Sequence, residues 1–424
     1  MKKILIILYL VTIFISCKKE YEAPVPDTSG WDIFNSSDVK PLSHAAQSAM
    51  EGVYTLSQGQ ETFGNLSAIK LSYVVAISDT TFNISGFFGK DIAYFICTGK
   101  RFKNTILLNG YWRKMVSAAT GIIHLTIAEN QGAQILFSQN PVVASGDVVM
   151  QGTFGYGQSN PTLPISLTYT RKLHIANNFR IMAHRSGGRT SDLLPVSENS
   201  VAMIQKTAAF GSTGIEIDVR MTSDGVPILY HDNTLNLREV QKSGLVGPIN
   251  NYTYNQLSTF VRLIHGEKIP TLREALNTVV FQTPLTFVWL DTKYTDSMTL
   301  IRAIQKEYLT LAAAAGRKLQ IVIGLPTTAS YNLFKTLPDY KNVPSLLELS
   351  PDDVPTINAM VWAPRFTLGP QNDLVDQIHG EGKLAFVWTL DVPEYIEKFI
   401  KNGHFDAILS NYPSCVAYNY YVQE

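Results

Sequence analysis

The second half of the chain alternates apolar runs that predict β-strands with longer stretches that predict α-helices. The predicted strands occupy residues 179–184, 214–221, 285–293, 319–325, 345–349, 359–365, 383–390 and 405–411. Helical periodicity fits the intervening residues 199–210, 272–280, 296–315, 331–337, 371–380 and 392–402. Alternating strands and helices over about 250 residues predict a (β/α)8 barrel of the TIM type, in which catalytic groups lie at the carboxyl ends of the strands.

Residues 44–173 have a different texture, with short runs of alternating apolar and polar residues that are typical of β-strands. Some of these runs open with a glycine followed by an aromatic residue, as at Gly110-Tyr111-Trp112. A glycine beside a large ring suits a strand that starts at a tight corner and buries the ring. We therefore expect an all-β accessory domain at 44–173, either a sandwich or a barrel, ahead of the (β/α)8 barrel at 174–424.

The N-terminus has the pattern of an export signal. Two lysines precede an apolar run at residues 4–15, which ends in Ser16-Cys17. A charged start and a short apolar run predict a signal peptide at 1–16, too short to span a membrane comfortably. The cysteine at the cleavage point resembles the lipid-modified cysteine of bacterial lipoproteins, which predicts lipidation of Cys17. A plain signal peptide with an incidental cysteine is the alternative.

The polar, proline-bearing residues 17–43 are expected to form a linker between the lipid and the folded domains. The chain would then be exported and attached through its lipid to a bacterial membrane, in the periplasm or at the cell surface. Because 35 basic residues balance 35 acidic ones, the chain has no basic surplus for a nucleic-acid partner. Cys97 and Cys415 lack metal-binding spacing and are expected to be buried apolar residues.

Two histidines and two carboxylates occur where the predicted strands approach the mouth of the barrel. His184 and Arg185 end the first strand, Glu216 and Asp218 lie two residues apart in the second, and His231 follows a short apolar run. Residues two apart in a strand project to the same face, and a divalent cation explains two carboxylates on an inward face. Two imidazoles can share the base and acid roles in phosphodiester hydrolysis. The alternative is that each histidine merely fills a hydrogen-bonding position.

Longer matches surround these residues in the same order. They are Ile-Met-Ala-His-Arg at 181–185, Gly-Ile-Glu-Ile-Asp-Val-Arg at 214–220, Ile-Pro-Thr-Leu-Arg-Glu-Ala-Leu at 269–276, Val-Trp-Thr-Leu at 387–390 and Asp-Ala-Ile-Leu-Ser-Asn-Tyr-Pro at 406–413. In this order and spacing they resemble the glycerophosphodiester phosphodiesterase family over about residues 178–415. The resemblance implies a TIM barrel, a small-molecule phosphodiester substrate, and His184 and His231 as the acid/base pair.

The resemblance also extends the site to the end of the third predicted strand. The family normally has a glutamate where this chain has Asp291, which is the implied third metal ligand after Glu216 and Asp218. Aspartate has one methylene less reach, so Asp291 either binds the metal directly, binds it through water or leaves a weaker site. Lys293 matches a lysine that contacts phosphate, and Ser186 stands where the family has glycine.

Four further side chains are assigned supporting or substrate-binding roles. The planar fork of Arg185 and the point charge of Lys293 suit phosphate oxygens, although either could pair structurally with a carboxylate. Glu198 matches a glutamate of the family, which implies a role in or behind the ligand shell; it also opens a helix, where a carboxylate is favourable. Trp388 ends the seventh predicted strand, so it packs either against the apolar edge of a polyol or into the core.

Together these features predict a lipid-anchored hydrolase that uses Ca2+ or Mg2+ to cleave a glycerophosphodiester into glycerol 3-phosphate and an alcohol. The sequence leaves open which histidine is the acid and whether a cyclic phosphate forms first. The altered Ser186 and Asp291 support a second hypothesis, a surface binding lipoprotein with weak or lost turnover. A third hypothesis is a related phospholipase-type phosphodiesterase that acts on intact lipid.

Overall fold

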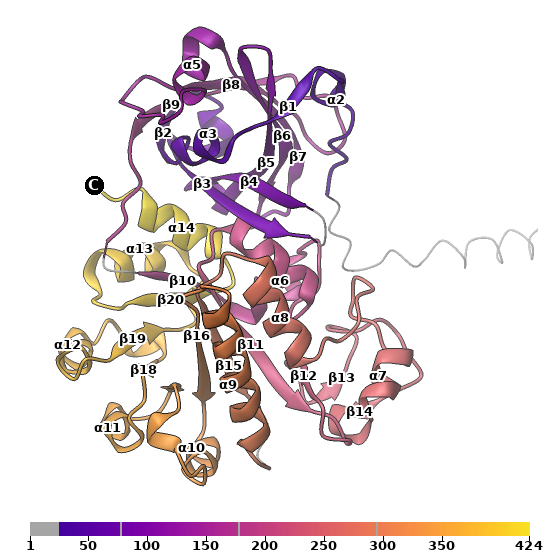
Figure 1. Cartoon of the computed structure of the whole chain (residues 1–424), viewed down its shortest axis with the longest axis vertical. Helices are drawn as coiled ribbons and strands as arrows, with labels where there is room; N and C mark the ends of the chain where they lie inside the picture. Colours follow the sequence, from indigo (N-terminus) through magenta and orange to yellow (C-terminus); the bar gives the residue numbers. More distant parts are fainter. Residues whose placement is uncertain (1–24, 77–78, 177–178, 294–295) are drawn as a thin grey trace, which may run out of the picture.

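The structure is a computed structural model that describes residues 25–76, 79–176, 179–293 and 296–424. Figure 1 shows an all-β domain above an α/β domain, with helices α6 (Val201–Thr207) and α14 (Pro413–Tyr421) between them. The predicted signal peptide, the lipidation site Cys17 and linker residues 18–24 lie outside the described residues. Within the described ranges, no helix combines the length and apolar character that a membrane crossing requires.

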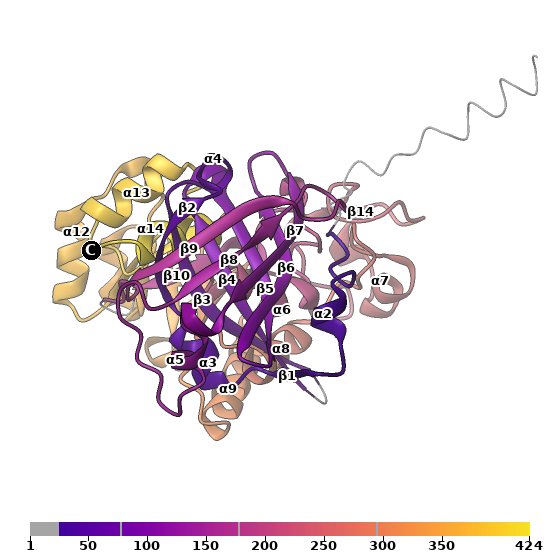
Figure 2. The same ribbon diagram turned by 90° about the horizontal axis from the view of Figure 1, so that it is seen from above.

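The accessory domain is a closed antiparallel barrel. Its strands are β1 (Val39–Pro41), β2 (Gly52–Gln58), β3 (Leu66–Val75), β4 (Thr80–Phe88), β5 (Ala93–Phe102), β6 (Thr105–Lys114), β7 (Thr120–Ile127), β8 (Val149–Phe154) and β9 (Leu163–Arg171). They follow the order β5-β4-β3-β2-β9-β8-β7-β6, and the pairing of β5 with β6 closes the circle, while β1 lies outside against β5. Of the two predicted alternatives, sandwich or barrel, the structure therefore has the barrel (Figure 2).

Aromatic side chains fill the interior of this barrel, as the alternation of the strands predicts. Trp112 is fully buried, packs edge-on against Phe63 and Phe154, and donates from Nε1 to the carbonyl of Gly155 at 2.9 Å. A side chain at Gly110 would place its Cβ 1.9 Å from the backbone oxygen of a residue on β5. The glycine beside the ring is thus needed because two strands approach closely there.

The folded part of the accessory domain starts earlier than predicted. Helix α2 (Asp32–Asn35) and strand β1 lie within residues 17–43, which we expected to be a linker. Trp31 stacks on His124 at 4.2 Å between ring centroids, and Phe34 is buried. The proline-bearing composition concealed two aromatic residues that have apolar surface to bury. Short helices α3 (His44–Ala49), α4 (Gln60–Phe63) and α5 (Ala133–Leu136) complete the domain.

The second domain is the predicted (β/α)8 barrel. Its parallel strands are β10 (Arg180–Ala183), β11 (Gly214–Met221), β15 (Phe287–Thr292), β16 (Gln320–Leu325), β17 (Ser345–Leu347), β18 (Val361–Trp362), β19 (Leu384–Val387) and β20 (Ala407–Ser410). They pair in this order, and β20 pairs with β10 to close the barrel. Several strands are shorter than predicted at one or both ends, so that His184, Trp388 and Asn411 directly follow or lie just beyond β10, β19 and β20.

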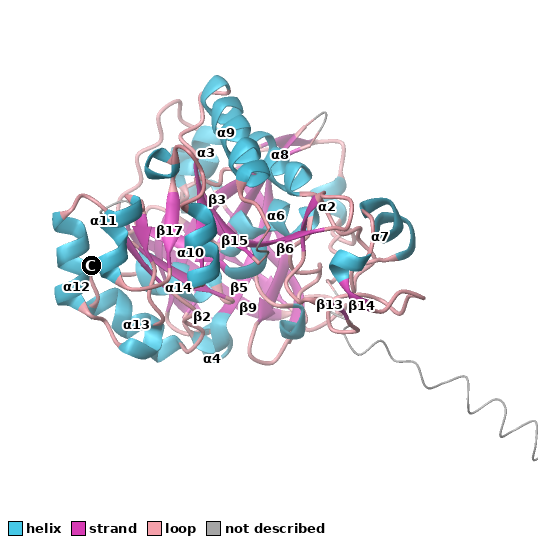
Figure 3. Cartoon of the chain, turned by 90° about the horizontal axis from the view of Figure 1, so that it is seen from below, coloured by secondary structure: helices cyan, strands magenta, loops and turns pink. Residues whose placement is uncertain are grey.

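A helix follows each of these strands along the chain. These helices are α6, α8 (Leu272–Gln282), α9 (Thr299–Ala314), α10 (Thr328–Phe334), α11 (Val354–Ile357), α12 (Asn372–Gly380), α13 (Pro393–Asn402) and α14. Figure 3 shows α8, α9, α12 and α13 outside the strands. Between β11 and α8 the chain makes an excursion that contains β12 (Pro227–Leu229), β13 (Thr234–Leu235), β14 (Gly247–Pro248) and α7 (Tyr254–Phe260). Strand β12 pairs antiparallel with β11, which brings the following His231 back to the barrel mouth.

The two domains share one continuous hydrophobic core. Phe87 and Tyr94 of the accessory barrel belong to the same buried cluster as Phe210 and Ala417 of the second domain. The rings of Tyr94 and Phe210 lie 5.5 Å apart between centroids. The accessory barrel therefore packs against the (β/α)8 barrel through buried apolar side chains. The thiols of Cys97 and Cys415 are both buried and free, as predicted.

Candidate active site

Three carboxylates meet at the carboxyl ends of β11 and β15. Asp218 on β11 is paired in register with Asp291 on β15. Glu216, two residues earlier on β11, is paired with Trp289, whose ring packs in the barrel interior. One oxygen each from Glu216, Asp218 and Asp291 lies within 4.8 Å of the others. The strand register therefore brings the predicted metal ligands together. Residues two apart in a strand, and residues paired across neighbouring strands, point to the same face, which here is the inward face of the barrel.

The acidic cluster has the properties of a cation site. Glu216 is 2% exposed and Asp218 is fully buried, yet Glu216 Oε1 and Asp291 Oδ1 have no hydrogen-bond partner among the described residues. Burial, together with the charges of Asp218 and Asp291, raises the pKa of Glu216 well above its usual value. Burial also acts to raise the pKa of Asp218, but the charges of Lys293, His231, His184 and Arg185 together outweigh it and hold that pKa at about 2. Unpartnered, buried carboxylate oxygens fit a hard divalent cation such as Ca2+ or Mg2+.

Lys293 lies against the acidic cluster. Its Nζ is 2.5 Å from Asp291 Oδ2 and 3.1 Å from Asp218 Oδ1. The ammonium thus compensates part of the buried negative charge. Since Lys293 remains a quarter exposed, its flexible stem can also present the ammonium to a phosphate above the carboxylates.

His184 follows β10 directly and is held from behind by an amide. Its Nδ1 lies 2.8 Å from Asn411 Oδ1, and its Nε2 is 3.8 Å from Glu216 Oε2. The amide nitrogen and backbone nitrogen of Asn411 both donate to Asp391, at 2.6 and 2.9 Å, which leaves Oδ1 to accept from the ring. This network assigns the proton to Nδ1 and a lone pair to Nε2. Burial and the charge of Arg185 lower the pKa of His184 to about 4.

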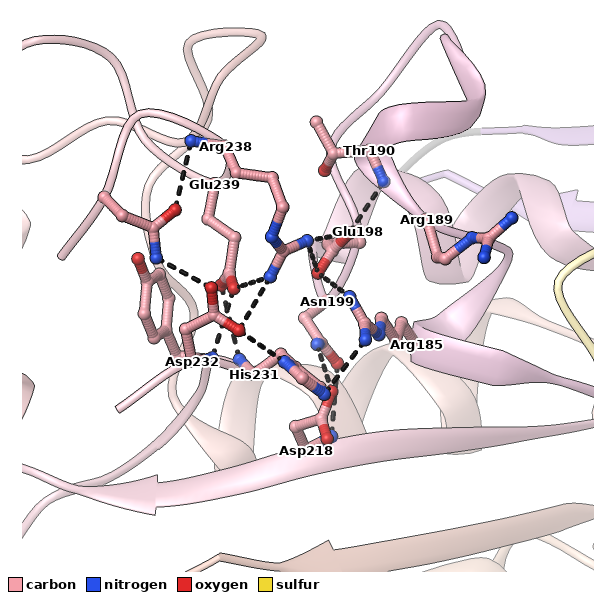
Figure 4. Close-up of polar contacts among 12 residues, drawn as sticks. Arg185, Arg189, Thr190, Glu198, Asn199, Asp218, His231, Asp232, Arg238 and Glu239 are labelled. Atoms are coloured by element: carbon pink, nitrogen blue, oxygen red, sulfur yellow. Dashed lines mark hydrogen bonds and ion pairs between the residues drawn. The ribbon is translucent and has the colours of Figure 1, made fainter. Parts of the chain in front are cut away.

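His231 is held from behind by a carboxylate. Its Nδ1 lies 2.6 Å from Asp232 Oδ1, while Arg185 Nη2 donates to its Nε2 at 2.9 Å (Figure 4). Arg238 pairs with Asp232 at 2.9 Å and with Glu239. His231, Asp232 and Glu239 also lie within 4.8 Å of one another, but Arg238 already occupies both carboxylates. This group is therefore a hydrogen-bonded network that fixes the imidazole.

The Arg185 side chain joins His231 to Glu198 (Figure 4). Arg185 has a left-handed backbone with a φ of 50°, and its amide nitrogen donates to Glu216 at 2.7 Å. Its Nη1 donates to Glu198 at 2.8 Å. Glu198 is 2% exposed and also accepts from Arg238 at 3.0 Å. Glu198 thus belongs to the arginine network that orients the phosphate-binding candidate, behind the acidic cluster.

Trp388 lies at the end of β19, where its ring borders both the core and the mouth. Its Nε1 donates to the carbonyl of Ala363 at 2.8 Å, and it packs against the inward-facing cluster of the barrel. The guanidinium of Arg365, which is exposed after β18, lies 4.5 Å above the ring. Both predicted roles, core packing and contact with a polyol, are compatible with this position.

Sequence reasoning missed several side chains that complete the site. Asn199 donates from Nδ2 to Asp218 at 2.7 Å and thereby orients a predicted metal ligand. Glu348 follows β17, and burial together with Asp291 raises its pKa well above the usual value. Asn411 ends the eighth predicted strand. Its position at a strand end is the signal that could have identified it, because that is where a (β/α)8 barrel places its functional groups.

The fold and the site together define a (β/α)8-barrel protein with a carboxylate cluster, two histidines and two cationic side chains at the carboxyl ends of its strands. The model of the glycerophosphoryl diester phosphodiesterase family matches residues 184–414, which is more than half of the chain. The chain belongs to this family. The matched range includes all of the predicted catalytic, metal-binding and substrate-binding residues.

Relatives with established names agree with this assignment. Human glycerophosphodiester phosphodiesterase 1 is 35% identical over 103 residues, which are 22% of this chain and 28% of the human protein. A glycerophosphodiester phosphodiesterase of Caldanaerobacter subterraneus is 24% identical over 244 residues, 55% of this chain and 94% of that protein. This chain thus spans little more than a quarter of the human relative that it matches.

Solved structures with similarity to the chain include two from bacteria. A glycerophosphodiester phosphodiesterase of Agrobacterium tumefaciens has a TM-score of 0.46 at 18% identity, covering 56% of this chain and 99% of that one. An Oleispira antarctica phosphodiesterase, solved with the product sn-glycerol-3-phosphate, has a TM-score of 0.42 at 17% identity, covering 55% and 94%.

Proposed function

We propose that the protein is a metal-dependent phosphodiesterase that hydrolyses a glycerophosphodiester to glycerol 3-phosphate and an alcohol. One observation carries this proposal. Buried carboxylate oxygens that lack a hydrogen-bond partner in the described ranges lie beside two imidazoles, and the network around each imidazole leaves its Nε2 with a lone pair. Family membership and the product bound to the Oleispira antarctica phosphodiesterase support the same substrate class.

Arg185 and Lys293 would bind the two non-bridging phosphate oxygens. A planar guanidinium matches two oxygens at once, and the ammonium adds a point charge beside them. A divalent cation held by Glu216, Asp218 and Asp291 would supply Lewis-acid stabilisation of the charge on the phosphate. Because Glu198 fixes one edge of the Arg185 guanidinium, the phosphate would be held in one orientation relative to both histidines.

The two imidazoles would exchange the protons of the reaction. The residue behind each ring differs: Asp232 lies behind His231, whereas the neutral amide of Asn411 lies behind His184. A carboxylate stabilises an imidazolium more than an amide does, so His231 would take up a proton on Nε2, in place of the hydrogen bond from Arg185, and donate it to the leaving alkoxide. His184 Nε2 would then accept the proton of the attacking hydroxyl.

The test is turnover by the purified full chain. Glycerophosphocholine and bis(p-nitrophenyl) phosphate are assayed after EDTA treatment and after addition of Ca2+ or Mg2+. The proposal expects cation-dependent release of glycerol 3-phosphate. No turnover with either cation, but saturable binding of glycerophosphocholine, would favour the surface binding protein. Faster release from intact phospholipid than from its deacylated form would favour the phospholipase-type enzyme.

We further propose that a lipid on Cys17 holds this protein at a bacterial membrane after export. Only the N-terminal sequence supports this, namely the apolar run that ends in Ser16-Cys17. Fractionation of cells that express the wild type and Cys17→Ser tests it. The wild type is expected with membranes and the variant away from them, and equal distributions would contradict lipid anchoring.

A further inference from the structure

The loop between β10 and α6 carries three residues of the site. This segment, residues 185–199, is called the 185–199 loop here. It begins with Arg185 and ends with Glu198 and Asn199. Four of its non-glycine residues have left-handed backbone: Arg185 (φ 50°), Ser186 (φ 67°), Leu193 (φ 53°) and Asn199 (φ 54°). Such a loop depends on outside contacts to keep one conformation, because left-handed backbone is unfavourable for residues other than glycine.

One of these contacts comes from the accessory barrel. Arg113, near the end of β6, is only 2% exposed, and its Nη2 donates a hydrogen bond to the carbonyl oxygen of Leu193. The next residue, Leu194, is also buried and packs in the core that contains Tyr94 and Met115 of the accessory barrel. The middle of the 185–199 loop is thus attached to the other domain by a buried cationic donor and by an apolar side chain.

Hydrogen bonds inside the loop connect this attachment to the site. The amide nitrogen of Leu193 donates to the carbonyl of Thr190 at 3.1 Å, and the amide nitrogen of Thr190 donates to Glu198 Oε2 at 2.7 Å. Glu198 Oε1 in turn accepts from Arg185 (Figure 4). A short chain of contacts therefore leads from Arg113 to the guanidinium that faces His231.

A second arginine of the accessory barrel provides a comparison. Arg171, at the end of β9, donates from Nη1 to the carbonyl of Gln423 at 2.7 Å and from Nη2 to that of Val422. It crosses the same boundary between domains with the same kind of hydrogen bond. However, its partners follow α14, and neither of them forms a hydrogen bond with the 185–199 loop in the described part of the chain. Loss of Arg171 would weaken the attachment of the domains without touching the site.

We propose that Arg113 is a positioning residue for the active site, and that the accessory barrel thereby fixes the 185–199 loop for phosphate binding. This inference rests on the proposed phosphodiesterase function for its kinetic readout, but not for its structural one. The role of the accessory domain is then to hold the 185–199 loop in place through the buried guanidinium of Arg113.

The experiment compares Arg113→Met and Arg171→Met in the full chain. Both variants lose an arginine–carbonyl contact across the boundary, and both are measured for melting temperature, kcat, KM and backbone hydrogen exchange. Arg113→Met is expected to lower kcat/KM for bis(p-nitrophenyl) phosphate about tenfold or more, the factor that corresponds to one lost charge-assisted hydrogen bond. Amides of residues 186–199 should exchange faster. Arg171→Met should leave kcat/KM and exchange in this loop unchanged, whatever its melting temperature.

Two further results decide the inference where turnover or folding fails. If the wild type has no turnover, the proposed function fails, whereas exchange in the 185–199 loop still tests the positioning role. If Arg113→Met does not fold, Arg113→Lys against Arg171→Lys replaces it, and the lysine at 113 should recover part of the protection because it retains a donor. Wild-type exchange and wild-type kcat/KM in a folded Arg113 variant would overturn the proposal.

Discussion

Glu216→Gln is expected to abolish cation binding and, at the same time, to stabilise the cation-free protein. The carboxylate of Glu216 is buried beside Asp218 and Asp291, and one of its oxygens has no hydrogen-bond partner within the part of the chain that the structure describes. Glutamine has the same shape without the charge, and its amide oxygen can still accept the hydrogen bond from the backbone of Arg185. The substitution therefore removes repulsion and a metal ligand together, with little change in packing.

The sign of the pH dependence follows from the raised pKa of Glu216. Below the unfolded pKa the group is protonated in both states and costs no stability. As the pH rises from there toward the raised folded pKa, the cation-free wild type loses stability, because the unfolded chain ionises more easily. The difference in melting temperature between the cation-free variant and wild type should thus be small in acid and grow toward neutral pH.

Cation binding should reverse the order of stability. At a cation concentration 100 times Kd, binding stabilises the folded wild type by about 2.7 kcal/mol. For a domain of about 250 residues this corresponds to an increase in melting temperature of roughly 5–10 °C. Glu216→Gln should show no such increase, since it has lost one of the ligands.

Thermal denaturation with EDTA and with Ca2+ or Mg2+ measures both effects. The control is Glu307→Gln, an exposed glutamate that pairs with Arg273 on the surface and should change neither quantity. A cation-free Glu216→Gln protein that melts below the wild type, or that still gains several degrees from the cation, would refute the assignment of this cluster as a cation site.

Three further predictions concern the site. His184→Ala and His231→Ala should each lower kcat by about 10²–10⁴-fold with an unchanged circular dichroism spectrum; near-normal rates in either variant would contradict the acid/base pair. Asp291→Glu should tighten cation affinity in calorimetry, since the longer side chain extends the reach of the ligand, and weaker affinity would show that Asp291 already fits. Because the pKa of His184 is lowered to about 4, the folded protein should lose up to about 3 kcal/mol of stability as the pH falls from 6.5 to 4. His184→Gln should flatten that part of the denaturation profile, and an unchanged slope would argue against a buried neutral imidazole.

The barrel strands were predictable because each is a local apolar run. The carboxylate pair was predictable for the same reason, since residues 216 and 218 share a face whatever the rest of the chain does. Register then decided the third member: Asp291 is opposite Asp218, which local sequence does not encode. The contact of His184 with Asn411 joins residues 227 positions apart and could only be suspected from the position of Asn411 at a strand end.

Helix α14 escaped prediction for a physical reason. Its buried residues include Cys415, Val416, Ala417, Tyr420 and Tyr421, which do not lie on one face of the helix. A helix covered on several sides has no polar face and therefore lacks the amphipathic period by which helices are recognised. The end of the predicted linker at residues 17–43 is folded instead, because this mostly polar stretch contains Trp31 and Phe34, which pack against the accessory barrel.

The position of α14 has a consequence for biogenesis. This helix packs against β3, β4 and β5, although the entire (β/α)8 barrel separates them along the chain. During translation the first domain therefore emerges with an exposed apolar surface, and the helix that buries this surface is synthesised hundreds of codons later. The export proposed above would require chaperones to keep the chain unfolded until α14 has been synthesised. Premature stop codons before Pro413 should therefore produce aggregates rather than a smaller active enzyme.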